Sequence, residues 1–272
     1  MPADPPTAEV MGLGSTAWIG HLRAGAAALG VEIDPEAAAR MARHAEAMIQ
    51  WNRRVNLTAI TDPAEVAVKH FVDSAAAVLR VDSGDRVLDI GSGAGFPGLV
   101  IKLLVPDATV TLVDAVRKKA SFLAHVIGLL GLSGIQARHV RAEDLAAEAD
   151  RWDRVVCRAV ADLPEIIRLA RPLLAPGGRI IALKGRLSDA ELAGARKVAD
   201  GSIQTIPYRL PGLGDRRTLV IHAPSSRSGG SAPAQEKADS SDSPDPREIK
   251  RSSTANNPTD SIRNRAADSE SA

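Results

Sequence analysis

Several features are scarce in this chain, and each shortage excludes a class of protein. Only Cys157 is a cysteine among 272 residues, so no intramolecular disulfide can form. No apolar run approaches the ~20 residues that a membrane-spanning helix needs, and the start lacks the basic and apolar parts of a secretory signal. Lys and Arg number 34 against 33 Asp and Glu, so the total charge does not indicate a strongly basic binder of nucleic acid, and local clusters matter more than the sum. We therefore expect a cytoplasmic protein.

Aromatic residues are also few, with three Trp, three Phe and one Tyr. The core must therefore rest on Val, Ile, Leu and Ala. Large apolar residues almost vanish after residue 223, where only Ile249 and Ile262 remain. Such a segment cannot bury enough apolar surface to offset its ordering entropy. We predict a disordered N-terminus over residues 1–14 and a disordered tail over residues 224–272.

Residues 15–83 carry the signals of a helical N-terminal cap. A first helix is predicted over residues 16–29. Asp34-Pro35 and Asp62-Pro63 each combine an N-cap residue with proline at the first helical position. Helical spacing predicts the buried faces of the two helices that follow: Met41, Ala45, Met48, Ile49 and Val55, then Val66, Phe71, Ala75, Val78 and Leu79.

After Gly84 short β-branched runs alternate with helical stretches. The predicted strands are residues 86–90, 109–114, 135–140, 154–159 and 179–184, and the predicted helices are residues 97–105, 117–131, 163–174 and 188–198. Alternation of this kind is typical of a parallel sheet with helices on both faces. Two last strands, residues 203–209 and 218–222, are close enough to form an antiparallel hairpin. Residues 84–223 are therefore predicted to form a Rossmann-like α/β domain with a mostly parallel, seven-stranded sheet.

A glycine-rich loop joins the first predicted strand to a helix, from Asp89 to Gly98. Glycine lets backbone approach a ligand closely, and a helix N-terminus offers free N–H groups. The pattern is ambiguous by itself. Gly93, Gly95 and Gly98 also satisfy the dinucleotide fingerprint, and a glycine loop that binds no ligand is a further alternative.

Three features favour S-adenosylmethionine over a dinucleotide. The run of alternating glycines begins directly at the strand end, at Gly91. Asp114 ends the next strand, where a carboxylate can accept both ribose hydroxyls, although a dinucleotide enzyme could use it in the same way. Ala142 and Glu143 follow the third strand, where class I methyltransferases commonly hold adenine. For Asp114 and Glu143 the alternative is a solvated loop carboxylate. The terminal hairpin is also the usual end of a class I methyltransferase.

The end of the fourth predicted strand limits the type of reaction. Methyltransferases acting on adenine amino groups place an Asn/Asp-Pro-Pro-aromatic motif there, whereas this chain has Cys157-Arg158-Ala159-Val160. Cys157 stands inside the strand, where a small buried apolar role suits it better than that of a nucleophile. The reaction therefore needs neither a protein nucleophile nor that amide clamp. No catalytic residue is assigned, and we expect no metal.

From about Asp34 to His222 the chain resembles the bacterial 16S rRNA guanine-N7 methyltransferase family, also called RsmG or glucose-inhibited division protein B. The stretches that carry the resemblance are residues 51–60, 69–74, 89–98, 117–119, 141–143, 157–160 and 183–185. The resemblance implies methyl transfer from S-adenosylmethionine to N7 of a guanine in 16S rRNA of the small ribosomal subunit. That atom carries a lone pair and no proton, so no general base is required. Catalysis would come mainly from aligning the reacting atoms.

The resemblance also implies a set of site residues. Gly91 and Phe96 should line the methionine part of the cofactor, and Arg158 should reach the cofactor or the RNA. The predicted cofactor-binding residues are Gly91, Gly93, Gly95, Phe96, Asp114, Ala142, Glu143 and Arg158. The candidate RNA contacts are Lys118, Lys119, Arg141 and Lys184. The structural alternatives are an ion pair for Arg158, solvated positions for the other cations and a helix-packing pair for His70 and Asp73.

Two rival functions stay open at this point. The chain could be a class I methyltransferase acting on a small molecule or a protein, or an RNA-recognising protein that binds the cofactor and methylates nothing. The basic positions favour RNA, whereas the glycine loop and the two acidic strand ends favour catalysis. We expect a monomer with no attachment to a membrane.

Overall fold

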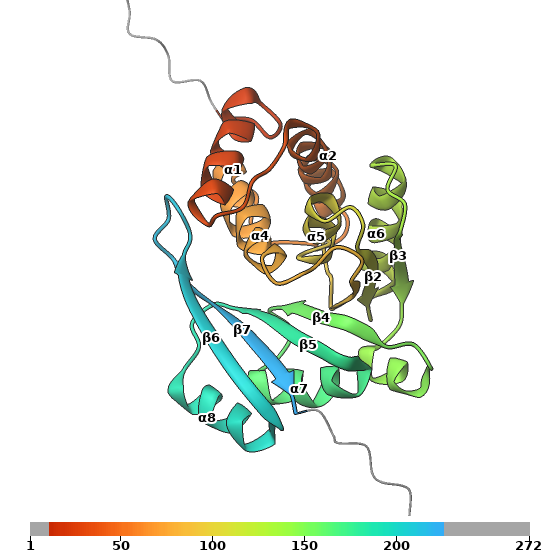
Figure 1. Ribbon diagram of the computed structural model, residues 1–272. Helices are drawn as coiled ribbons and strands as arrows, with labels where there is room; N and C mark the ends of the chain where they lie inside the picture. The colour runs from red at the N-terminus through yellow and green to blue at the C-terminus, as the bar shows by residue number, and fades with distance from the viewer. Residues whose placement is uncertain (1–10, 226–272) are drawn as a thin grey trace, which may run out of the picture. The chain divides into compact units, whose positions relative to one another are not determined.

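Seven strands form one mixed sheet in the computed structural model, which describes residues 11–225 (Figure 1). The spatial order is β3-β2-β1-β4-β5-β7-β6. The bounds are β1 Arg86–Ile90, β2 Thr109–Asp114, β3 Ile135–His139, β4 Trp152–Arg158, β5 Leu174–Lys184, β6 Gly201–Arg209 and β7 Arg216–Pro224. The first five strands are parallel, and β7 pairs antiparallel with both β5 and β6. The predicted sheet and its terminal hairpin are confirmed.

Helices cover both faces of this sheet (Figure 1). One face carries α1 (Thr16–Ala28), α2 (Pro35–Asn52), α3 (Pro63–Val66), the π-helix η1 (Ala67–Val72), α4 (Asp73–Val78), α5 (Gly98–Leu104) and α6 (Arg117–Leu129). The other carries α7 (Leu163–Ala170) and α8 (Asp189–Val198), together with the short 3₁₀ turns η2 (Ala142–Ala147) and η3 (Arg171–Leu173). Successive strand residues serve opposite cores, so Val87 packs on the first and Leu88 on the second.

The predicted helix starts are confirmed by their caps. Asp34 Oδ1 accepts a hydrogen bond from Ala37 N at 2.7 Å, and Asp62 Oδ1 accepts one from Glu65 N at 2.9 Å. Each cap satisfies a backbone donor that the first helical turn leaves free. The residues of these helices pack into the same core as one face of the sheet.

Two members of the predicted helical faces are misplaced. Leu79 is 52% exposed, because the helix ends at Val78 and Leu79 no longer follows its buried stripe. Val55 lies beyond the end of α2 at Asn52 and is only half-buried. Both errors come from extending a helical period past the residue where the helix stops.

The ends of the described chain bear on the predicted boundaries. Met11 and Leu13 already pack against the first core, so ordered chain begins before residue 15. The predicted disorder of residues 1–10 and 226–272 falls outside the described residues. Within residues 11–225, no helix is long and apolar enough to cross a membrane.

Candidate functional site

A cavity of about 550 Å³ opens at the carboxyl ends of β1, β4 and β5, and we call it the glycine-loop pocket. Its lining includes Gly91 and Gly93 from the glycine loop, Arg158 at the end of β4, Lys184 at the end of β5 and His70 from η1. In open α/β sheets ligands bind at this edge, outside the carboxyl ends of the strands. The volume falls within the range of small-molecule sites.

The glycines of the loop divide into two pairs. Gly91 and Gly93 line the pocket with positive φ angles of +67° and +57°. A Cβ on Gly93 would meet nothing closer than the Gly91 carbonyl oxygen at 3.9 Å, so it would project into open space. A Cβ on Gly95 would instead collide with Leu99, and one on Gly98 would lie 2.7 Å from Asp89 Oδ2. Gly98 therefore permits close packing of α5 on the sheet, Gly95 leaves room for the side chain of Leu99, and the first pair borders the cavity.

Two carboxylates hold the backbone of this loop by accepting hydrogen bonds from its N–H groups. Asp89 is fully buried, and its Oδ2 accepts a hydrogen bond from Gly98 N at 2.9 Å. Burial raises the pKa of Asp89 to about 7. Asp114 accepts hydrogen bonds from Gly93 N at 3.0 Å and Val116 N at 2.8 Å. Asp114 thus lies beside the pocket and shapes its loop, and its contact with a ribose stays a prediction.

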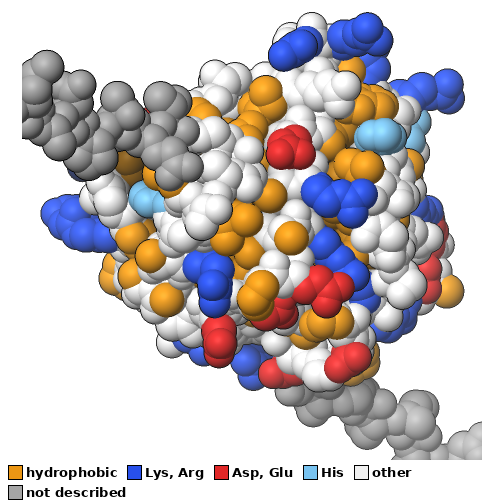
Figure 2. Space-filling view, turned by 90° about the horizontal axis from the view of Figure 1, so that it is seen from above, with side chains coloured by type: hydrophobic (Ala, Val, Ile, Leu, Met, Phe, Trp, Pro, Cys, Tyr) orange, Lys and Arg blue, Asp and Glu red, His pale blue; other side chains and the backbone are white. Residues whose placement is uncertain are grey.

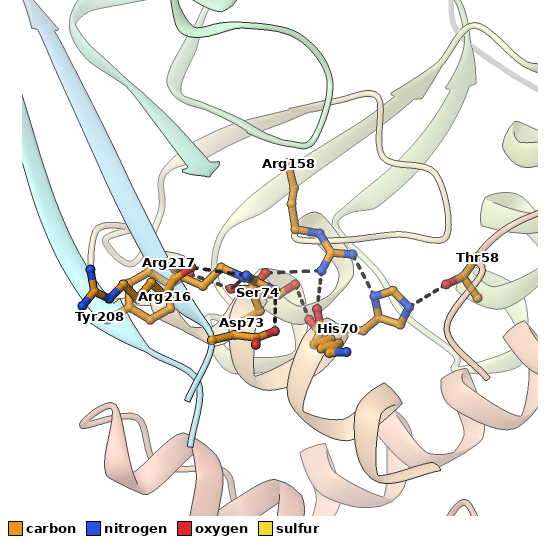
Figure 3. A network of polar contacts seen from close by, with 10 residues as sticks. Thr58, His70, Asp73, Ser74, Arg158, Tyr208, Arg216 and Arg217 are labelled. Carbon is orange, nitrogen blue, oxygen red and sulfur yellow. Dashed lines mark hydrogen bonds and ion pairs between the residues drawn. The ribbon is translucent and has the colours of Figure 1, made fainter. Parts of the chain in front are cut away.

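Arg158 connects the sheet to the helical part of the chain (Figure 3). Its Nη1 donates to the Lys69 carbonyl at 2.7 Å, and its Nη2 donates to His70 Nδ1 at 3.1 Å. Asp73 Oδ2 lies 3.6 Å from Nη1, and the guanidinium carbon lies 5.0 Å from the centre of the Phe96 ring. The ion pair considered as the structural alternative for Arg158 therefore exists, and the same side chain lines the pocket.

His70 is held neutral, and its tautomer follows from its neighbours. An arginine can only donate, so Nδ1 must accept from Arg158, and Nε2 carries the hydrogen that is donated to Thr58 Oγ1 at 2.9 Å. Burial, and after it the charge of Arg158, lowers the pKa of His70 to about 3. With both ring nitrogens engaged, His70 positions neighbouring groups and has no free site for a proton.

Asp73 extends the network into the terminal hairpin (Figure 3). Its Oδ1 accepts a hydrogen bond from the Tyr208 hydroxyl at 2.7 Å and lies 3.5 Å from Nε of Arg217. Asp73 is 4% exposed, so these partners compensate a buried carboxylate. Tyr208 and Arg217 were not predicted as site residues. No local pattern in the sequence marks them, because they meet Asp73 from 135 or more positions away.

An aromatic stack supports the loop from the helical side. The Phe96 ring lies between His70 and His44, with ring centres 4.9 Å apart on each side. Nε2 of His44 bonds the Ala94 carbonyl at 2.7 Å. Burial lowers the pKa of His44 to about 4, so it is neutral. Phe96 is only 2% exposed, so it contributes little open surface to the pocket, and its stacking on two histidines holds the loop in place.

Basic side chains in the pocket lining are mostly neutralised by partners. Lys69 pairs with Glu65 at 2.6 Å, and Lys184 Nζ lies 2.8 Å from both Glu191 and the Ala161 carbonyl. Among the described residues, Lys119 is the lining cation without an ion pair. On the helical side of the surface, basic, acidic and apolar side chains are interspersed (Figure 2).

The structure brings together only part of the predicted set. Gly91, Gly93, Phe96, Arg158, Lys119 and Lys184 line the pocket, whereas Gly95, Asp114, Ala142, Glu143, Lys118 and Arg141 do not. Ala142 is buried in the second core, while Glu143, Lys118 and Arg141 are exposed. Ala142 and Glu143 stand in η2, after β3, farther along the same sheet edge.

Comparison with known proteins gives consistent matches. The family described as "GidB: rRNA small subunit methyltransferase G" matches residues 37–220. A protein named "Ribosomal RNA small subunit methyltransferase G" from Geobacter sp. (strain M21) is 45% identical over 205 residues, which cover 74% of this chain and 94% of that protein. Proteins of the same name from Geobacter sulfurreducens and Myxococcus xanthus are 46% and 41% identical, and the matches cover 73% and 75% of this chain and 94% and 95% of those proteins.

Proposed function

The chain belongs to the rRNA small subunit methyltransferase G family, and we propose that it transfers a methyl group from S-adenosylmethionine to N7 of a guanine in 16S rRNA. The observation that carries the proposal is the glycine-loop pocket at the carboxyl edge of the sheet. The proposal places the enzyme in the cytoplasm as a monomer whose partner is the rRNA of the small ribosomal subunit.

The pocket residues fit the proposed cofactor. A Cβ on Gly93 would project into open space of the pocket, so this backbone is accessible to a ligand, whereas a Cβ on Gly91 would lie 2.8 Å from the Val160 side chain. Gly91, Gly93 and Phe96 would hold the methionine part of S-adenosylmethionine, which supplies a methyl carbon made electrophilic by its sulfonium. The ribose and adenine would extend along the edge toward Asp114, Ala142 and Glu143.

The chemistry of the lining suits an acceptor that has no proton to lose. His70 is neutral with both nitrogens engaged, and Asp73 is held by Tyr208, Arg158 and Arg217. Neither group is free to act as a general base. Guanine N7 needs none, because its lone pair attacks directly. The chain's own contribution is therefore to bind and align the reactants.

The charges of the pocket fit the product. Methylation leaves a positive charge at N7, which an uncompensated cation next to it would oppose. Arg158 and Lys184 each have a carboxylate partner. Lys119 has none among the described residues and would suit a phosphate of the RNA.

The test is methyl transfer from radiolabelled S-adenosylmethionine to 16S rRNA, to small ribosomal subunits and to bulk protein in parallel. We expect label in RNA and, after digestion, mass spectrometry that finds it as 7-methylguanosine. Label on adenine, on a pyrimidine or only on protein would reject the N7-guanine proposal. Comparing the amount of label transferred to naked rRNA with the amount transferred to assembled subunits shows which of the two is the substrate.

A further inference from the structure

A second cavity, of about 940 Å³, lies where the terminal hairpin meets the turn after β5, and we call it the hairpin groove. Its lining comes from residues 185–187, from the end of β6 and from the start of β7. Gly185 and Arg217 line both this groove and the glycine-loop pocket, so the two cavities adjoin. A chain entering the pocket from this side would lie along the groove.

The groove is strongly basic. Four arginines line it, at positions 186, 209, 216 and 217, against one acidic residue, Asp215. Arg217 is already engaged, at 3.5 Å from Asp73 and 3.6 Å from Asp215. Arg186, Arg209 and Arg216 are exposed, and no carboxylate of residues 11–225 forms an ion pair with them. Three positive charges therefore remain uncompensated at one site.

Two of these arginines oppose each other across the hairpin. Arg209 of β6 and Arg216 of β7 are direct cross-strand partners, and like charges in this relation destabilise a sheet. Nη1 of Arg209 donates to the Gly214 carbonyl at 3.1 Å, which holds its guanidinium at the hairpin end. An anion between the two guanidinium groups would attract both of them and so offset their mutual repulsion.

We propose that the hairpin groove binds the phosphates of the RNA strand that flanks the target guanine. The inference rests on the proposed function and adds the path of the substrate to it. Guanidinium groups grip phosphate oxygens bidentately and stay charged at every relevant pH. Such contacts fix the position of the strand without reading its sequence. Arg186, Arg209 and Arg216 hold the phosphates, while the adjoining pocket receives the base.

The test uses the full chain with Arg209→Gln and Arg216→Gln together, assayed on 16S rRNA and on small ribosomal subunits. The KM for RNA should rise about tenfold, equivalent to roughly 1.4 kcal/mol. The slope of log affinity for RNA against log salt should become shallower by about 1.4 to 2, since two phosphate contacts are lost. Affinity for S-adenosylmethionine should stay at the wild-type value. Stability should not fall, because a repulsive pair has been removed.

Two further variants make the result specific. Arg209→Lys with Arg216→Lys keeps the charge, so it should restore the wild-type salt slope while recovering only part of the affinity. Arg168→Gln with Arg179→Gln removes the same charge from exposed arginines of α7 and β5 that do not line either cavity. This control should behave as wild type in all assays.

A wild-type KM and salt slope in the Arg209→Gln, Arg216→Gln variant would overturn the proposal, as would an equal effect in the control. Direct filter binding of labelled 16S rRNA separates this failure from that of the proposed function. A wild-type protein that binds RNA through the groove yet methylates no rRNA would contradict the proposed function alone. A groove that holds an acidic protein segment instead would leave RNA binding unchanged in the variant and so reject the proposal.

Discussion

The glycine-loop pocket and the hairpin groove share Gly185 and Arg217, but most cations of the pocket have carboxylate partners and most arginines of the groove have none among residues 11–225. In the pocket Arg158 is surrounded by Asp73, His70 and the Lys69 carbonyl. In the groove Arg216 faces another arginine and has no carboxylate partner among the described residues. Buried and paired groups fix geometry, whereas exposed and unpaired groups are free to bind an anion.

This difference has an energetic consequence. Removing one member of a buried ion pair leaves its partner uncompensated in a poorly solvated site, so stability falls. Removing an exposed, unpaired arginine leaves no buried charge without a partner, so it lowers the affinity for RNA and not the stability. Variants of the buried, paired residues of the pocket should therefore change unfolding, and variants of the exposed arginines of the groove should change affinity for RNA.

The largest effect is expected for Asp73→Ala. Arg158, Arg217 and Tyr208 would lose their shared acceptor, and the free energy of unfolding should fall by about 3–5 kcal/mol. Tyr208→Phe removes a single donor and should cost only about 1 kcal/mol. Denaturant unfolding of both proteins provides the measurement. Equal losses in the two variants would show that Asp73 is not the centre of the network.

A second test separates the two pairs of glycines. Gly98→Ala would force a Cβ to within 2.7 Å of Asp89 Oδ2, and overpacking of this kind costs about 1–3 kcal/mol. Gly93→Ala has open space for its Cβ and meets only the strain of its positive φ, about 1 kcal/mol. Thermal unfolding should therefore rank Gly98→Ala below Gly93→Ala. The reverse order would contradict the division of the loop.

Acid should lower the stability of the fold through His44, a member of the buried aromatic stack beside the glycine loop. His44 has a pKa of about 4 in the fold against ~6.5 when unfolded. Between these values the unfolded chain binds a proton that the folded chain does not, so stability falls as pH drops through this window. At about pH 5.5 the loss from His44 is about 1.4 kcal/mol.

His44→Gln isolates this contribution, because glutamine still offers an N–H to the Ala94 carbonyl but does not titrate. Its stability should fall by about 1.4 kcal/mol less than wild type between about pH 7.5 and pH 5.5. Asp89 has the opposite effect: its pKa in the fold is raised to about 7, so its protonation stabilises the folded chain as the pH falls. It acts equally in both proteins and cancels in the difference. Parallel pH profiles would show that His44 is not held neutral.

The smallest effect compares two neighbouring lysines. Lys119 lines the pocket, whereas Lys118 is exposed and lies outside its lining. Lys119→Ala should raise the KM for RNA about fivefold, the equivalent of roughly 1 kcal/mol, and Lys118→Ala should leave it near wild type. Initial-rate kinetics at fixed salt measure both. A larger effect at Lys118 would place the RNA on a different path.

Local signals account for what the sequence predicted well. Alternating β-branched and helical segments predict the sheet, and Asp-Pro pairs predict two helix starts, because both depend on neighbouring residues. Cys157 was predicted to be a small buried residue, and it is 2% exposed within β4, where burial raises the pKa of its thiol to about 12. The spacing from Gly91 to Gly98 predicts a loop against a cavity.

Long-range contacts account for what it did not predict. The spacing alone does not show that Gly95 supports packing while Gly93 borders the cavity, since that depends on Leu99 and on the position of α5. Tyr208, Arg209 and Arg216 belong to the last hairpin and reach the site only through the strand order. Lys184 was predicted as an RNA contact, but its pairing with Glu191 depends on where α8 packs.

The most direct test of the account is a calorimetric titration of S-adenosylmethionine into wild type, Gly93→Ala and the Arg209→Gln, Arg216→Gln variant. The Cβ of Gly93→Ala would enter the pocket, so affinity should fall at least about tenfold, or roughly 1.4 kcal/mol, in protein that remains folded. The groove variant should match wild type. Unchanged affinity in Gly93→Ala, or an equal loss in the groove variant, would contradict the assignment of the glycine-loop pocket to the methyl donor.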